Sequence, residues 1–454
     1  MILERAKGST LDVSIAYQDR AEILALLSAH AQQFGTLNFV RSYWSEIQKF
    51  SQAVSGPFPL LHTLHINLDE FDIPGLGTVD SPSLPLFSGA VNIKKFIMRS
   101  EVAPFLDRFA FPNLTTFELS MVSDFQEFPV SQLLNFLEAS PALQTVRVGI
   151  KAGLFLGDVP TERVIVLPNV ETLSLTQGVP GYGVAAHISC PSARFTSLVF
   201  ENFLVDWMPQ EIFPDSISWN AIGPQYVAST INEVVVSIST AGDVPLACSI
   251  SFVSPGPASL ELGYTMIAGY DGCNENPHSL GEKHSHGFSQ ALMAVRKHPL
   301  LGNVKRLHIL DRHVFLGPHH LEHITSEATQ LFKSMGPLEE LVLDVDNLRQ
   351  ILFPFFDLSE SADIQPNAFP PIKELTIAKR SAQLLEEECM AAIVKLAKSQ
   401  YALGVPFECV VFLIKDPPVA MGERLKPWVG EVHFCERTIV EDELCNGVIL
   451  GDYL

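Results

Sequence analysis

The stretch Leu61-His62-Thr63-Leu64-His65-Ile66 decides the fold of this chain, because its spacing of apolar residues returns along almost the whole sequence. An apolar residue, a second one three positions on and a third two positions later form the pattern of a short strand with one buried face. Starting positions in the best-kept copies differ by about 27 to 34 residues, which indicates an internal structural repeat. The further copies are Ile93/Phe96/Met98, Leu114/Phe117/Leu119, Leu143/Val146/Val148, Val170/Leu173/Leu175, Ile231/Val234/Val236, Val304/Leu307/Ile309, Leu338/Leu341/Leu343 and Ile372/Leu375/Ile377, with weaker ones at Phe34/Leu37/Phe39 and Val429/Val432/Phe434.

The residues before the phrase strengthen this interpretation. Proline cannot donate to a strand ladder and ends a preceding helix, so it belongs at the junction into each strand. Such prolines are Pro59, Pro112, Pro141, Pro168, Pro337 and Pro370. Further upstream, apolar residues on one face predict helices over Asp19–Phe34, Ser131–Ala139, Ser289–His298, Ser326–Met335 and Ser381–Gln400.

Helix, junction, strand and loop make up one repeat unit, which has nothing of its own against which to bury its apolar face. Neighbouring units must therefore stack. Stacking predicts an α/β fold, an irregular leucine-rich-repeat solenoid with parallel strands on the concave side and helices and loops outside.

The domain prediction is a single repeat array over residues 1–454. The phrase is poorly kept between Ile231 and Val304, where we expect two divergent repeats and a protruding histidine-rich loop from about Asp271 to Gly287. Alternatively, the array has two halves, 1–240 and 288–454, around the divergent segment 241–287.

Composition excludes several classes of protein. The net charge of −21 and the lack of a basic cluster argue against a nucleic-acid partner. We find no apolar run long enough to span a membrane, and charges in Met1–Lys7 argue against an export signal. The seven cysteines are dispersed without a Cys-x-x-Cys pair, which favours a reducing compartment, the cytoplasm or nucleus.

The N-terminal sequence resembles a known group. Leu3-Glu-Arg-Ala-Lys-Gly-Ser-Thr-Leu-Asp-Val-Ser-Ile15 is similar to the stretch that follows the F-box in many fungal (basidiomycete) F-box proteins, and the likeness continues loosely along the chain. The resemblance implies a substrate-recognition region of a ubiquitin-ligase adaptor. The F-box itself, which begins Leu-Pro-x-Glu-Leu, is not found, so docking on the ligase is assigned to no residue here.

A second departure concerns the turns after the strands. Regular leucine-rich repeats carry Asn or Cys three residues past the last apolar position. Because these places hold other residues, we expect no asparagine ladder and uneven curvature. The residues are Asp69, Val122, Lys151, Gly178, Arg312, Asp346 and Arg380.

Three motifs that could carry chemistry are better explained by structure. Gly287-Phe-Ser289-Gln-Ala291 resembles a nucleophile elbow, but no strand precedes it, so we interpret Ser289 as a helix N-cap. Gly181-Tyr-Gly183 imitates a dinucleotide fingerprint but is not followed by a helix. Nine of the fourteen histidines lie between His278 and His323, at spacings that could hold zinc, yet the surrounding loop offers no fixed geometry. We therefore expect no catalytic, cofactor or metal residues.

The residue between the last two apolar positions of each phrase should point to solvent, because side chains alternate faces along a strand. This row is mixed in charge, which favours recognition of a protein. It comprises Asn38, His65, Ile97, Glu118, Arg147, Ser174, Val235, His308, Val342, Thr376 and His433. The predicted function is a protein-binding repeat scaffold and not an enzyme, with contacts through His65, Glu118, Arg147, Ser174, His308 and Thr376. The alternatives are a serine hydrolase centred on Ser289, or a truncated product without a ligand.

Overall fold

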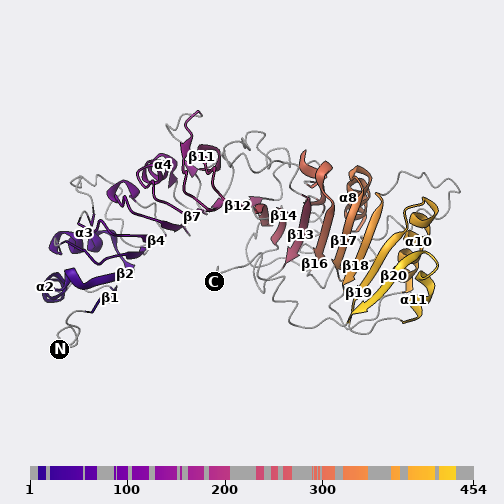
Figure 1. Ribbon diagram of the computed structural model, residues 1–454, viewed down its shortest axis with the longest axis horizontal. Coiled ribbons are helices and arrows are strands. Elements are labelled where there is room, and N and C mark those ends of the chain that lie inside the picture. The colour runs from indigo at the N-terminus through magenta and orange to yellow at the C-terminus, as the bar shows by residue number, and fades with distance from the viewer. Residues whose placement is uncertain are drawn as a thin grey trace, which may run out of the picture. The chain divides into compact units, whose positions relative to one another are not determined.

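The fold is mixed α/β, with strands that pair mainly in parallel (Figure 1). This confirms the α/β class and the parallel pairing expected from the sequence. The computed structural model describes residues 9–16, 21–54, 57–68, 86–87, 89–100, 105–121, 128–150, 154–155, 162–177, 184–204, 232–239, 247–253, 259–267, 289, 291–293, 295–296, 299–311, 321–345, 370–378, 387–414 and 419–435. No helix in these described ranges is long and apolar enough to cross a membrane.

The chain divides into two compact units. Unit 1 comprises Met1–Phe203 with Pro214–Val227 and Gly256–Leu262, and unit 2 comprises Leu204–Phe213, Ala228–Pro255 and Gly263–Leu454. Strand β15 (Ser259–Ile267) has residues in both units.

The sheet of unit 1 has the order β1-β2-β3-β4-β5-β7-β10-β12, and each neighbouring pair is parallel. Each predicted strand from Phe34 to Leu175 is present. The strands are β1 (Leu11–Ala16), β2 (Phe34–Ser42), β3 (Thr63–Leu68), β4 (Lys95–Ser100), β5 (Thr116–Met121), β7 (Thr145–Ile150), β10 (Thr172–Gln177) and β12 (Phe195–Leu204). Two short parallel pairs lie outside this sheet: β6 (Phe128–Pro129) with β8 (Leu154–Phe155), and β9 (Ile165–Val166) with β11 (Ile188–Ser189).

The sheet of unit 2 has the order β14-β13-β16-β17-β18-β19-β20. The strands are β13 (Glu233–Ser239), β14 (Ala247–Val253), β16 (Arg306–Asp311), β17 (Leu338–Val345), β18 (Ile372–Ala378), β19 (Phe407–Leu413) and β20 (Val429–Cys435). All neighbours pair in parallel except β13 and β14, which are antiparallel. β14 therefore departs from the parallel pairing expected for the strands of this fold. In the sequence, β14 begins eight residues after β13 ends, and a parallel return needs a crossover of a dozen residues or more.

The helices also follow the predicted order, with shifts at their ends. The α-helices are α2 (Ala21–Ala29), α3 (Trp44–Ala53), α4 (Val130–Glu138), α8 (Leu321–Ser334), α10 (Glu387–Ala402) and α11 (Val419–Leu425), and the 3-10 helices are η1 (Ala31–Gln33), η2 (Leu106–Arg108), η3 (Val184–His187) and η5 (Pro299–Asn303). The prediction of one helix up to Phe34 was wrong, because Phe34 begins strand β2. Helix α8 begins five residues before the predicted Ser326, because the apolar periodicity marks the buried face better than it marks the ends.

One repeated turn leads into the strands of unit 1. The amide of its fourth residue donates to the carbonyl of its first, from Leu61 to Phe58 (3.2 Å), from Leu114 to Phe111 (3.1 Å) and from Leu143 to Ser140 (3.2 Å). Proline suits the second position of such a turn because its φ angle is already set. The predicted junction role of Pro59, Pro112 and Pro141 is thereby confirmed.

Asparagines in this turn join one repeat to the next. The Asn92 side-chain amide donates to the Pro59 carbonyl (2.8 Å), that of Asn113 to Val91 (2.9 Å) and that of Asn169 to Pro141 (3.0 Å). The sequence does therefore contain a series of asparagines between repeats, but before the strands. The positions after the strands, where we expected none, lie outside the described residues.

The two units have different cores. In unit 1, Phe96 is fully buried and its ring lies 4.9 Å from that of Phe109, 5.3 Å from Phe111 and 5.8 Å from Phe117, between ring centroids. In unit 2, the strand residues Leu341, Leu375 and Val410 are fully buried, as are Ala392 and Ile393 of α10. A cluster of aromatic rings thus lies among the aliphatic side chains of the unit 1 core, whereas the unit 2 core combines aliphatic side chains of the strands and of α10 with separate rings such as Phe332 and Phe412.

Candidate binding faces

The strands of each unit present every second side chain on a face that stays partly open to solvent. In unit 1, Leu64, Ile66 and Leu68 of β3 are buried, whereas Thr63, His65 and Asn67 between them are half-buried. Strands β4, β5, β7 and β10 repeat this pattern, because parallel pairing in register carries it from strand to strand.

We call the partly open side of these five strands the unit 1 face. Its residues form three rows across the sheet. They are Thr63, Lys95, Thr116, Thr145 and Thr172; His65, Ile97, Glu118, Arg147 and Ser174; and Asn67, Arg99, Ser120, Gly149 and Thr176.

The unit 2 face is defined in the same way, by the two rows in register from β13 to β20. Its residues are half-buried or exposed. They are Glu233, Arg306, Glu340, Glu374, Cys409 and Glu431; and Val235, His308, Val342, Thr376, Val411 and His433.

The structure brings the six predicted contact residues into two groups. His65, Glu118, Arg147 and Ser174 lie in one row of the unit 1 face, with Ile97 between His65 and Glu118. His308 and Thr376 lie in one row of the unit 2 face, on either side of Val342. Because the groups belong to different units, they are two separate candidate surfaces.

Positive charge prevails on the unit 1 face. Lys95, Arg99 and Arg147 are its cations, and Glu118 is its only carboxylate. Lys95 lies 3.7 Å from Glu118 (Nζ to Oε1), so these two charges largely offset each other. Arg99 and Arg147 are both exposed, and neither has an ion-pair partner among the described residues.

His65 lies next to these cations. Burial, followed by the charge of Lys95, lowers the pKa of its imidazole, although Glu118 acts in the opposite direction. Its Nε2 atom is buried without a hydrogen-bond partner among the described residues. The face is therefore a place where additional negative charge would be favourable.

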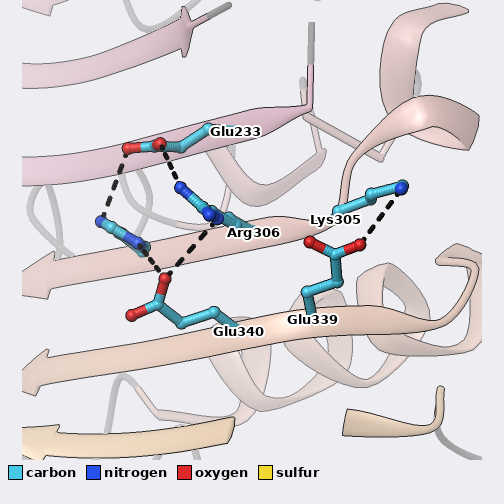
Figure 2. A network of polar contacts seen from close by, with 6 residues as sticks. Glu233, Lys305, Arg306, Glu339 and Glu340 are labelled. Carbon is cyan, nitrogen blue, oxygen red and sulfur yellow. Dashed lines mark hydrogen bonds and ion pairs between the residues drawn. The ribbon is translucent and has the colours of Figure 1, made fainter. Parts of the chain in front are cut away.

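Carboxylates prevail on the unit 2 face. Figure 2 shows Glu233 and Glu340 on either side of Arg306, with Arg306–Glu233 at 4.0 Å and Arg306–Glu340 at 3.8 Å. The His308 ring lies 3.8 Å from both of these carboxylates, through opposite nitrogens. Glu374 and Glu431 continue the row and are exposed.

A second set of charges lies just outside this face, at the beginnings of the strands. Lys305 donates to Glu339 at 3.1 Å, as Figure 2 also shows, and Lys373 lies 4.0 Å from Glu408. The hydrogen bond from Lys305 lowers the pKa of the Glu339 carboxyl. These pairs are exposed and alternate in sign, so they contribute little net charge to the unit 2 face.

The motifs with possible chemistry gain no support from the described residues. Ser289 is half-buried within a helical segment, not at its N-cap, while Gly287 and the histidine-rich loop 271–287 lie outside the described residues. So does Gly181-Tyr-Gly183, which leads into the single-turn η3 and then β11. No group of three or more His, Cys, Asp or Glu residues in the described ranges could hold a metal ion.

Two features of these faces were not predicted from the sequence. The unit 1 face has three rows of side chains in register, where only one row was expected. The row was expected to be mixed in charge, whereas the prevailing charge is positive on the unit 1 face and negative on the unit 2 face. The two additional rows on unit 1 could have been predicted from the residues two positions before and two positions after each predicted contact residue. Comparisons with protein-family models, with curated proteins and with solved structures found no match for this chain.

Proposed function

We propose that this chain is an irregular leucine-rich-repeat solenoid that binds another protein on the partly open faces of its sheets. The observation that carries the proposal is the register. One row of side chains continues without a shift across β3, β4, β5, β7 and β10, and a second across β13 and β16–β20. Repeat proteins bind partners on such extended surfaces.

Two further observations support a repeat solenoid. The turns before β3, β4, β5, β7, β10 and β12 share the same hydrogen bond, and asparagine side chains join several neighbouring turns. Two short parallel strand pairs, β6–β8 and β9–β11, also form outside the main sheet. This is expected where stacked repeat units pair at a second place along their length.

The composition of the faces suits a protein partner. They combine threonine, histidine, aliphatic and charged side chains in adjacent positions, and a protein surface offers complements to all of these. Nucleic acid would require many cations on one surface, and the unit 1 face has three.

The resemblance of Leu3–Ile15 to fungal F-box proteins suggests what the bound protein is. By that resemblance, we propose that it is a substrate for ubiquitination in the cytoplasm or nucleus. Loss of this chain from its source organism should then lengthen the half-life of the bound protein. An unchanged half-life would remove this role and leave the binding function untouched.

Site-specific photo-crosslinking tests the binding function. A photoreactive amino acid placed at Ser174 and, separately, at Thr376 should capture a defined protein from an extract of the source organism. Matched positions away from the faces are Ser192, in the turn before β12, and Ala391 on α10, both exposed. Equal capture at all four positions, or capture at neither face position, would refute the proposal.

A further inference from the structure

The unit 1 face differs in charge from the chain around it. The whole protein carries a net charge of −21, yet this face holds three cations and one carboxylate. At physiological ionic strength, exposed charges are screened beyond a distance of about 8 Å. Among the described charges, a ligand at the face therefore interacts most strongly with Lys95, Arg99 and Arg147, and Glu118 offsets Lys95.

The positions of the cations indicate the shape of a ligand. Lys95 and Arg99 lie in the outer rows of β4, and Arg147 lies in the middle row of β7, two strands away in the sheet. Adjacent strands are about 4.8 Å apart and residues rise about 3.3 Å along a strand. The two guanidinium groups are thus spread over a distance that a short extended peptide covers, rather than gathered around one small anion.

The availability of the arginines favours a carboxylate ligand. Lys95 already has Glu118 at 3.7 Å, while Arg99 and Arg147 are exposed without an ion-pair partner among the described residues. A guanidinium binds a carboxylate through two parallel hydrogen bonds, which gives such pairs both strength and direction. Ile97 lies between the cations, half-buried, and offers an apolar contact at the centre of the face.

We infer that the unit 1 face binds an acidic, extended segment of the partner protein, with Arg99 and Arg147 each pairing with a carboxylate. This inference rests on the proposed function and specifies the chemistry of its partner. The unit 2 face, where carboxylates outnumber Arg306, would repel the same segment.

A defined peptide tests the inference on the full chain. The probe is a fluorescent twelve-residue peptide of alternating Glu and Val, and its control replaces each Glu with Gln. Fluorescence anisotropy should show salt-dependent binding of the Glu peptide and at least tenfold weaker binding of the Gln peptide. Arg147→Glu should weaken binding of the Glu peptide at least tenfold, whereas Arg147→Lys, which keeps the charge, should weaken it less.

A matched variant on the other unit separates local from overall charge. Glu374→Arg changes the net charge by the same amount as Arg147→Glu but in the opposite direction, at an exposed position of the unit 2 face. It should leave the affinity for the Glu peptide within about twofold. Circular dichroism and thermal unfolding establish that each variant is folded, which is expected because both side chains are exposed.

Three results would overturn the inference. They are equal affinity of the wild type and Arg147→Glu, tighter binding of a single-stranded DNA of matched charge than of the Glu peptide, and salt-sensitive self-association that Arg147→Glu abolishes. The last result would make a second copy of this chain the occupant. If photo-crosslinking at Ser174 succeeds and the peptide does not bind, the proposed function stands and only the acidic segment is refuted.

Discussion

Unit 1 and unit 2 build their sheets from the same apolar phrase but support them with different cores. In unit 1, Phe96 lies among other rings, and the helices of the described part are short, such as α4 with nine residues. In unit 2, α8 and α10 are longer, with fourteen and sixteen residues, and the core combines aliphatic side chains with buried rings such as Phe332 and Phe412. The apolar phrase therefore specifies a strand and its register, while the helices and core side chains that pack against the strand can vary.

The same contrast extends to the faces. The register is kept in both units, but unit 1 presents Lys95, Arg99 and Arg147 where unit 2 presents Glu233, Glu340 and Glu374. In a repeat scaffold, the buried residues that hold the sheet together and the residues that set the charge of its open face can vary independently, because the two kinds alternate along each strand. Substitutions in one unit should therefore leave the other unit unchanged.

The largest effect is expected in the aromatic core. Phe96→Ala should lower the free energy of unfolding of unit 1 by about 3–5 kcal/mol, because it removes a fully buried ring and leaves a cavity. Urea unfolding followed by hydrogen exchange and mass spectrometry would locate the loss. Peptides of unit 2 should keep their protection, and an equal loss in both units would show that they unfold as one.

The asparagines of the turns should contribute less. Asn113→Ala removes one hydrogen bond to the Val91 carbonyl and should cost about 0.5–1.5 kcal/mol. Asn113→Asp, which keeps the shape but loses the donor, should cost at least as much. The free energy of unfolding from urea titration measures both variants. If Asn113→Asp were neutral, the side chain would serve only to fill space.

A pH-dependent effect should be found on unit 1. The pKa of folded His65 lies below its ordinary value of 6.5, so the unfolded chain binds the proton more readily. Stability from this group is thus present above pH 6.5 and is lost as the pH falls through the folded pKa. His65→Gln should reduce the difference between urea midpoints at pH 8 and pH 5, and an unchanged difference would contradict this assignment.

The smallest effect is expected at the strand beginnings of unit 2. Glu339→Gln removes the negative charge of the pair with Lys305 but keeps an acceptor oxygen, and both side chains are exposed to water. The urea midpoint should not change measurably at physiological salt. A clear loss of stability there would mean that the alternating charged pairs on unit 2 act together as a network.

Much of the fold could be predicted from the sequence, because burial of one strand face leaves a pattern that only a few structures satisfy. Strands β2–β5 and β16–β18 lie at the positions predicted from the repeated apolar phrase, for example around Leu64, Phe96 and Leu375. The antiparallel β14 could not be predicted in this way, since Ile250 and Phe252 alternate equally well in either strand direction. The asparagines were missed because their partners are backbone carbonyls of the preceding turn, which depend on stacking and not on local pattern.

The candidate site was predicted in outline. Alternation alone placed His65, Glu118 and Arg147 on one side of the sheet, and the register then put them in one row. The difference in sign between the units could not be assigned before the division of the chain was known. That Arg147 has no ion-pair partner among the described residues could not be predicted either, because it depends on which side chains of neighbouring strands lie within reach.

The carbonyl before each strand has a consequence for how this protein could change over evolutionary time. The Lys94 carbonyl accepts from the amides of Thr115 and Thr116, and the Gln144 carbonyl accepts from those of Glu171 and Thr172. Each copy is therefore aligned to its predecessor at the strand entrance, whatever the length of chain that separates them. Insertions and deletions beyond a strand's exit leave that alignment intact, so repeats can diverge in length while the sheet keeps its order. A designer who wished to add a segment to this chain should place it after a strand and never before one.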